Sequence, residues 1–268
     1  MELHANGSGT RWGPLFGANA RVWADTWEGS DGWGTRVYDH VLDGSGIGPG
    51  TAVLDCGCGA GRFVSLATER GADVAGIDAA KDLVEIAASR SPRADLRVGD
   101  IESLPWTDDS FDVVAGFSSF QFADDHTRAL AEARRVSRGG VWVAVPTRLT
   151  ESGIPQVFTP LMALFSPDVL PSLKRSGMYA LSAPGSLEEA LASVGMSIVH
   201  DDTVEATMVF SDAAAVVGAF LSAGATALAV EHSGQPAVER ALYEALDPFS
   251  DDRGRVTLPG WFRVVDAG

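Results

Sequence analysis

The stretch VLDCGCGAGRF, residues 53–63, is the part of this chain that decides how the rest folds. It begins inside a short apolar run, residues 51–56, and continues through three glycines at alternate positions, Gly57, Gly59 and Gly61. A buried strand followed by a glycine-rich turn and a helix lets backbone N–H groups approach a ligand and points the helix N-terminus at it. We therefore expect a ligand site at the carboxyl end of a first strand.

Apolar runs and helical patterns alternate along the chain on the carboxyl side of this stretch. The runs predict strands, and the segments between them carry apolar residues at helical spacing. The predicted strands are 73–77, 95–98, 111–117, 141–145, 196–199 and 261–265; the predicted helices are 62–70, 81–90, 125–136, 186–194, 212–230 with a break at Gly224, and 236–246. This alternation predicts an α/β fold, a doubly wound parallel sheet with helices on both faces.

Composition excludes several kinds of partner. Among 268 residues, 20 are basic and 36 acidic, so the formal net charge is −16. Nucleic-acid backbones and anionic membranes would be repelled, and no apolar run or leader pattern predicts a membrane span or a secretory signal. We expect a cytoplasmic protein with a small-molecule substrate; whether it forms a homodimer is left open. Cys56 and Cys58 are half of a zinc site at most, and we predict no metal.

Three aspartates, Asp55, Asp78 and Asp100, end three successive strands. The dinucleotide fingerprint would place a third glycine at position 62, where this chain has Arg62. Asp55 would oppose a pyrophosphate, but it suits a ligand with an ammonium group and no phosphate, such as S-adenosylmethionine (SAM). Asp78 is placed to accept both hydroxyls of a ribose, and Asp100 to accept from the amine of adenine.

These motifs resemble those of the class I SAM-dependent methyltransferases. The resemblance is closest to the branch with ubiquinone/menaquinone-type and small-metabolite enzymes, and the flanks are similar to actinobacterial small-molecule members. It covers residues 36–146 and is carried by four segments, 54–61, 76–78, 99–114 and 134–140.

The resemblance implies a Rossmann-like seven-stranded sheet with the last strand antiparallel, and helical lid elements. It implies transfer of a methyl group from SAM to O, N or C of a small acceptor, in specialised metabolism. It also implies roles for individual residues. The glycines, with Cys58, would line the methionine end of SAM, Asp55 would lie beneath it, and Phe117 would contact it. Asp78 would hold the ribose with Ala79 against the base, and Asp100 and Ile101 would bind the adenine.

The sequence predicts an N-terminal helical and aromatic lid at residues 1–45. A SAM-binding core follows at 46–268, with inserted cap segments at about 147–185 and 206–255. Four aromatic residues of the first segment are candidates for acceptor binding: Trp23, Trp27, Trp33 and Tyr38. They could simply dock an N-terminal helix on the core, or they could form a lid over SAM and a flat acceptor. Both interpretations stay open.

Residues for the acceptor chemistry are harder to find. Phe120 and Gln121 follow the fourth strand, where such sheets bind ligands, and are pocket candidates. His232, between two lid helices, is the candidate base, although a base is needed only if the attacking atom must lose a proton.

Two other functions stay open. A SAM-binding enzyme could catalyse cyclisation or decarboxylation, because the motifs indicate binding and not turnover. An NAD-dependent oxidoreductase would suit the fold, but Asp55 and Arg62 argue against it.

Overall fold

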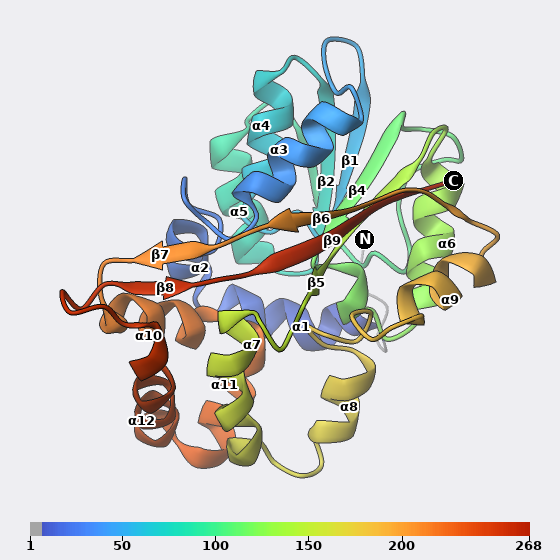
Figure 1. Ribbon diagram of the computed structural model, residues 1–268. Coiled ribbons are helices and arrows are strands. Elements are labelled where there is room, and N and C mark those ends of the chain that lie inside the picture. The colour runs from blue at the N-terminus through green and yellow to red at the C-terminus, as the bar shows by residue number, and fades with distance from the viewer. Residues whose placement is uncertain (1–6) are drawn as a thin grey trace.

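The computed structural model describes residues 7–268, and at its centre lies a seven-stranded sheet in the order β3-β2-β1-β4-β5-β9-β6 (Figure 1). Its strands are β1 (Ala52–Cys56), β2 (Asp73–Asp78), β3 (Asp95–Val98), β4 (Val113–Phe117), β5 (Val141–Thr147), β6 (Ile198–Glu205) and β9 (Trp261–Ala267). β9 pairs antiparallel with both β5 and β6, whereas the other pairs in this sheet are parallel. The predicted Rossmann-like sheet with an antiparallel last strand is confirmed.

Helices cover both faces of this sheet, because its central strands are apolar on both sides. Val53 packs into a cluster with residues of α3 and α4, while the next residue, Leu54, packs against α6 and α9. The helices that flank the sheet are α3 (Thr35–Gly44), α4 (Arg62–Glu69), α5 (Lys81–Arg90), α6 (His126–Val136) and α9 (Ser186–Ser193).

The strand order reverses at the neighbouring strands β1 and β4, since β2 and β3 lie on one side and β5 on the other. Open α/β sheets bind ligands at such a point, outside the carboxyl ends of the strands. The glycine-rich turn leaves β1 at this end, so the fold places the decisive stretch beside a natural crevice.

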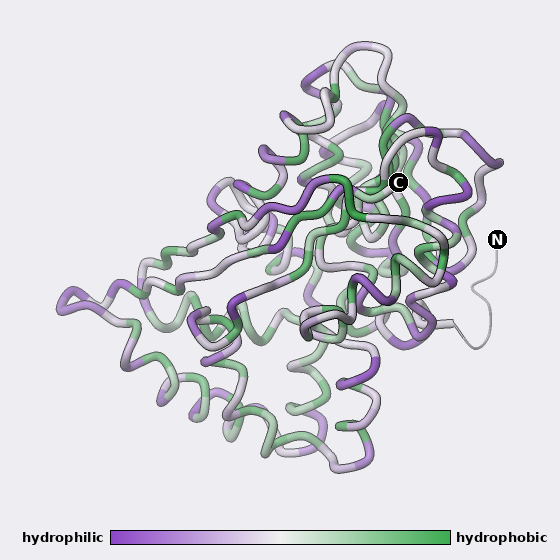
Figure 2. The backbone as a smooth tube through the Cα atoms, turned by 45° about the vertical axis from the view of Figure 1, so that its right-hand side comes forward, coloured by the Kyte–Doolittle hydropathy of each residue, from purple (hydrophilic) through white to green (hydrophobic). Residues whose placement is uncertain are grey.

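A helical cap lies beyond the carboxyl ends of the strands (Figure 1). We use "cap" for α7 (Gly153–Phe158), α8 (Leu170–Arg175), α10 (Ala213–Ser222), α11 (Gly224–Ser233), α12 (Gln235–Ala245) and the two-stranded sheet of β7 (Met208–Phe210) and β8 (Val256–Leu258). Figure 2 colours the backbone by hydropathy and shows both hydrophobic and hydrophilic residues among the helices. In the cap, α12 is amphipathic, whereas α10 and α11 are mostly apolar along their length. Leu161, Phe220 and Leu242 are among the fully buried residues of the cap's core.

The first helices, α1 (Ser8–Gly17) and α2 (Ala20–Thr26), pack against both the sheet layer and the cap. The Trp27 indole N–H donates to the Ala219 carbonyl of α10 at 2.8 Å, and the Trp12 ring lies edge-on to Phe122 at 4.9 Å between centroids. We call residues 8–33 the N-terminal segment. The N-terminal segment therefore joins the sheet layer to the cap at the crevice.

The structure differs from the sequence-based expectation at the edge of the sheet. β6 runs to Glu205, well past the predicted end at residue 199. The sequence did not indicate this part of the strand because its residues are polar and exposed, which an edge strand tolerates. Within residues 7–268, no single helix combines the length and apolar composition needed to cross a membrane; α10 and α11, bent by 93° at their junction, meet those criteria only as a pair.

Candidate cofactor and acceptor site

A cavity lies where the carboxyl ends of the strands meet the N-terminal segment and the cap. On one side, which we call the loop side, it is lined by the strand ends and the glycine-rich turn: Asp55, Gly57, Cys58, Gly59, Asp78, Ala79, Gly99, Asp100, Ile101 and Phe117. On the other, which we call the aromatic side, the larger lining residues are Trp12, Phe16, Trp23, Trp27, Trp33, Phe122, Met178 and Phe262. Segments far apart in the sequence thus meet around one space.

Asp78 holds the glycine-rich turn in place. Its Oδ2 accepts the Gly59 N–H at 2.9 Å, and its Oδ1 accepts the Ala80 N–H at 2.8 Å. Burial raises the pKa of Asp78, and these N–H groups act in the opposite direction. Each oxygen keeps a further acceptor site, so the side chain can still bind a hydroxyl in the cavity.

Asp55 is buried at the bottom of the loop side, 2% exposed, and its Oδ1 has no hydrogen-bond partner among the described residues. Burial, then the negative charges of Glu28 and Asp78, raises the pKa of Asp55 well above its usual range. A buried carboxylate oxygen without a donor is costly unless a ligand supplies one. The site therefore fits a cationic ligand such as SAM.

Asp100 lines the cavity, but the N-terminal segment already contacts its carboxylate. Oδ1 accepts the Glu102 N–H at 2.9 Å and the Ser8 hydroxyl at 3.4 Å, and Oδ2 accepts the Gly9 N–H at 3.2 Å. Asp100 consequently fastens the start of α1 over the end of β3, in addition to facing the space that the sequence assigned to adenine.

Glu28 is a cavity residue that the sequence did not reveal. It is 7% exposed, and its Oε1 accepts the Ala60 N–H at 2.8 Å and the Trp23 indole N–H at 2.7 Å. Its Oε2 accepts the Arg62 N–H at 3.1 Å. Burial raises the pKa of Glu28 despite these donors. The partners lie 32 and 34 residues away, so no local pattern marks this glutamate.

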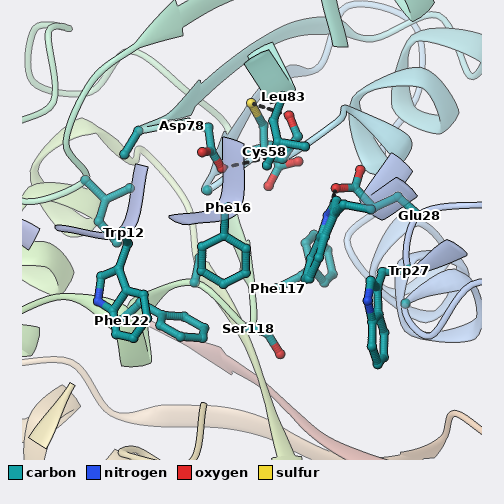
Figure 3. A pocket seen from close by; sticks show the side chains of 18 of the residues that line it. Trp12, Phe16, Trp27, Glu28, Cys58, Asp78, Leu83, Phe117, Ser118 and Phe122 are labelled. Carbon is teal, nitrogen blue, oxygen red and sulfur yellow. Dashed lines mark hydrogen bonds between the residues drawn. The ribbon is translucent and has the colours of Figure 1, made fainter. Parts of the chain in front are cut away.

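The aromatic side is built by contacts among the N-terminal residues. The Phe16 and Trp23 rings meet edge-on with 5.1 Å between their centroids, and the centroids of the Trp23 and Trp27 rings are 5.7 Å apart. Figure 3 shows Trp12, Phe16 and Phe122 together on one side and Trp27 beside Glu28 on the other, with Asp78 beyond them. Trp23, Trp27, Trp33 and Tyr38 all line the cavity, as expected for a lid, and Trp27 also docks the segment on the cap. The two interpretations are therefore not exclusive.

Three predicted acceptor-side residues lie elsewhere. Phe120 is buried in the core beneath Gly116, and the buried Gln121 donates to the Met178 carbonyl at 3.3 Å instead of facing the cavity. His232, the predicted base, is exposed near the end of α11 and is not among the residues that line the cavity, so the structure does not bring it to the acceptor position.

Gly61 also lies outside the cavity lining. A Cβ there would lie 2.7 Å from the Ala87 Cβ, and φ is +82°, so this glycine allows α4 to pack closely on α5. Gly57, Gly59 and Cys58 line the loop side, together with the predicted Ala79, Ile101 and Phe117.

Comparisons with known proteins agree with this geometry. Residues 54–145 match a family model described as a methyltransferase domain. A Mycolicibacterium smegmatis protein named as a probable S-adenosylmethionine-dependent methyltransferase is 30% identical over 201 residues, which are 73% of this chain and 66% of that protein. The chain belongs to the class I SAM-dependent methyltransferases. The predicted family and its cofactor, SAM, are thereby confirmed.

Other relatives are similar mainly to the central part of this chain. Malonyl-acyl-carrier-protein O-methyltransferase of Serratia marcescens is 37% identical over 104 residues, which are 39% of this chain and 41% of that enzyme. The aligned regions span from about two fifths to two thirds of these relatives' own length. Among solved structures, the (4+2)-cyclase SpnF has a TM-score of 0.54 and 23% identity, covering 87% of this chain and 80% of that one, which shows a shared fold.

Proposed function

We propose that this methyltransferase transfers the methyl group of SAM to an uncharged, largely apolar small molecule, such as a specialised metabolite. The observation that carries this proposal is the composition of the cavity wall. Of the described residues, those that line the cavity include four carboxylates (Glu28, Asp55, Asp78 and Asp100) and no lysine, arginine or histidine.

The loop side supports the binding of SAM. Asp55 offers its unpartnered oxygen to the cationic end, Asp78 offers its free acceptor sites to the ribose, and Asp100, Ala79 and Ile101 surround the position expected for adenine. SAM supplies a methyl group on a sulfonium, which leaves as a neutral thioether. Because that leaving group already drives the reaction, the chain's tasks are to align the two molecules and to exclude water.

The aromatic side supports an uncharged acceptor. An acceptor with a carboxylate or phosphate would bring a negative charge beside four carboxylates, without a basic side chain in the described lining to pair with it. The Serratia relative is named for a malonyl group, which carries a carboxylate. An acceptor of that charge does not suit the described lining of this chain.

Ser118, at the end of β4, is proposed to orient the acceptor. Its backbone lies in the left-handed region, with φ at +51°, and its N–H donates to the Ala144 carbonyl of β5 at 2.9 Å. Its buried hydroxyl has no partner in the described chain, and the residue lines the cavity (Figure 3). A strained residue with an unpaired hydroxyl at a ligand site indicates a role in binding.

The proposed chemistry is one displacement. A lone pair of the acceptor forms a bond to the methyl carbon while the carbon–sulfur bond breaks and its electrons stay on sulfur. The described lining holds no histidine or lysine, and its four carboxylates are assigned here to the cofactor. We therefore expect an acceptor atom that attacks without prior deprotonation by a side chain, such as a neutral amine; any proton is lost to water afterwards.

The test uses SAM with a ¹³C-labelled methyl group and pairs of compounds that share a ring system. Each pair contains an uncharged amine and its carboxylate analogue, for example 2-naphthylamine with 2-naphthoate. We expect label in uncharged members, with equimolar S-adenosylhomocysteine detected by mass spectrometry. Label confined to the carboxylates would contradict the proposal. Conversion of a compound without S-adenosylhomocysteine would instead favour a cyclase-like or decarboxylating reaction.

A further inference from the structure

Glu28 occupies the place where a helix ordinarily receives an anionic ligand. The Ala60 and Arg62 N–H groups lie at the N-terminus of α4, and such free N–H groups attract negative charge. Both donate to the Glu28 carboxylate. The protein has therefore filled this anion site with its own side chain, from a segment more than 30 residues upstream.

The Glu28 carboxylate still has room for one more donor. A carboxylate offers about four acceptor sites, and the three N–H groups of Ala60, Arg62 and Trp23 use three of them. Arg90 lies nearby, but its Nη1 is 3.9 Å from Oε2 and its N–H groups donate to the backbone carbonyls of residues 24, 28 and 60. Since Glu28 lines the cavity, the remaining site is open to a ligand.

A second carboxylate faces the same space with an unpartnered oxygen. Asp55 is 98% buried, with Oδ1 lacking any donor from residues 7–268, and the Glu28 and Asp78 charges both act on it. Buried charges need compensation, and the described cavity lining contributes no positive side chain. A cationic group in the cavity would satisfy both carboxylates at once.

We propose that Glu28 and Asp55 together bind the cationic end of SAM, so that the N-terminal segment is part of the cofactor site and not only a cover for the acceptor. This role rests on the proposed function. It has a second consequence: because Glu28 already accepts the N–H groups at the start of α4, the carboxylate of SAM is not bound there.

The first test compares two ligands on the Glu28→Gln variant. SAM carries the cationic end, whereas 5′-methylthioadenosine keeps the adenosine and lacks every charge. By calorimetry we expect Glu28→Gln to weaken SAM binding about 10-fold or more and to change methylthioadenosine binding less than about twofold. Glu102→Gln is the matched control, because Glu102 is 8% exposed and accepts the Asp124 N–H at 2.8 Å but lies outside the cavity lining.

Each other outcome overturns the inference. Equal weakening of both ligands would mean that Glu28 only holds the segment in place. Tighter SAM binding would mean that the carboxylate of SAM competes with Glu28 for the α4 N–H groups. If the unaltered protein binds methylthioadenosine but not SAM, this role is wrong; if it binds neither, the proposed function fails as well.

A second test needs no variant and holds if Glu28→Gln does not fold. Decarboxylated SAM keeps both cationic groups and lacks the carboxylate. If Glu28 fills the anion site, the unaltered protein should bind decarboxylated SAM at least as tightly as SAM. Binding weaker by 10-fold or more would mean that the protein binds the SAM carboxylate. Because the described lining has no basic side chain, the N–H groups at the start of α4 would then be its site, which refutes the assignment.

Discussion

Replacing Asp55 with asparagine should make the ligand-free protein more stable while weakening SAM binding. The side chain keeps its shape, but it loses its negative charge in a position where one oxygen has no donor and two other carboxylates lie close. The expected effects on stability and on binding have opposite signs, and a merely structural aspartate would not produce that combination.

The sign of the stability effect follows from the direction of the pKa shift. Burial, with the charges of Glu28 and Asp78, raises the pKa of Asp55 in the folded state. A group with a raised folded-state pKa stabilises fully below its unfolded-state pKa, and that contribution is lost as the pH rises through the folded-state pKa. Asp55→Asn should therefore be the more stable protein at pH 8, with an advantage that shrinks toward pH 4.

The magnitude follows from the unpaired oxygen. Asparagine is no better paired there, but it removes the buried charge. An unpaired buried polar group costs about 1–3 kcal/mol and a charged one costs more, so losing the charge should raise the free energy of unfolding by about 1–3 kcal/mol at pH 8. For a chain of 268 residues this is a rise in Tm of about 2–5 °C. Losing a hydrogen bond to a charged group costs about 1.5–3 kcal/mol, which corresponds to SAM affinity about 10- to 150-fold lower.

Thermal unfolding at pH 8 and pH 5, with calorimetric titration of SAM, measures both effects. Asp78→Asn is the matched control, because both Asp78 oxygens accept backbone N–H groups, and an amide would turn a donor toward one of them. We expect that variant to be less stable. An Asp55→Asn protein that is less stable at pH 8, or that binds SAM with unchanged affinity, would refute the reasoning.

Three further predictions concern the loop, the N-terminal segment and the acceptor. Gly61→Ala should destabilise the fold by about 2–5 kcal/mol, because the cost of a left-handed backbone and the cost of overpacking against α5 add. Gly254→Ala is the control, at φ +80° with open space around it, and should cost only about 1–2 kcal/mol. Similar losses of the two variants in urea unfolding would contradict this. Trp27→Phe, which removes the hydrogen bond to α10, should cost about 1–3 kcal/mol, and an unchanged Tm would show that this bond does not dock the segment. Ser118→Ala should lower kcat/KM for the acceptor about 5- to 10-fold while leaving the Kd for SAM within about twofold; equal loss in both would disprove an acceptor-specific role.

The sheet and the loop side of the cavity could be predicted from the sequence because their signals are local. The apolar run at 51–56, the alternate glycines and Asp78 each depend on neighbours in the same strand–turn–helix unit. The two carboxylates at the ends of β1 and β2 then meet because parallel strands end at one edge of the sheet. Family membership adds the cofactor but not the detailed contacts.

The remaining parts depend on contacts that no local pattern records. Glu28 accepts a hydrogen bond from the glycine-rich turn, although the sequence around it would equally suit a solvated turn. Asp100 accepts the N–H of Gly9, which is 91 residues away in the sequence. The sequence places His232 between two predicted helices, which suggested a pocket residue, but in the structure it lies near the end of α11 and is exposed. The polar middle of β6 hid a strand because an edge strand need not alternate toward a core.

The most direct test of the account is a crystal structure of the protein with SAM bound. We expect the ammonium or sulfonium to lie within hydrogen-bond or ion-pair distance of Asp55 and Glu28, with the ribose at Asp78. The methyl group should be directed toward the aromatic side, near Phe16 and Trp27. SAM bound with its carboxylate on the Ala60 and Arg62 N–H groups, or with its methyl group directed away from the aromatic side, would contradict it.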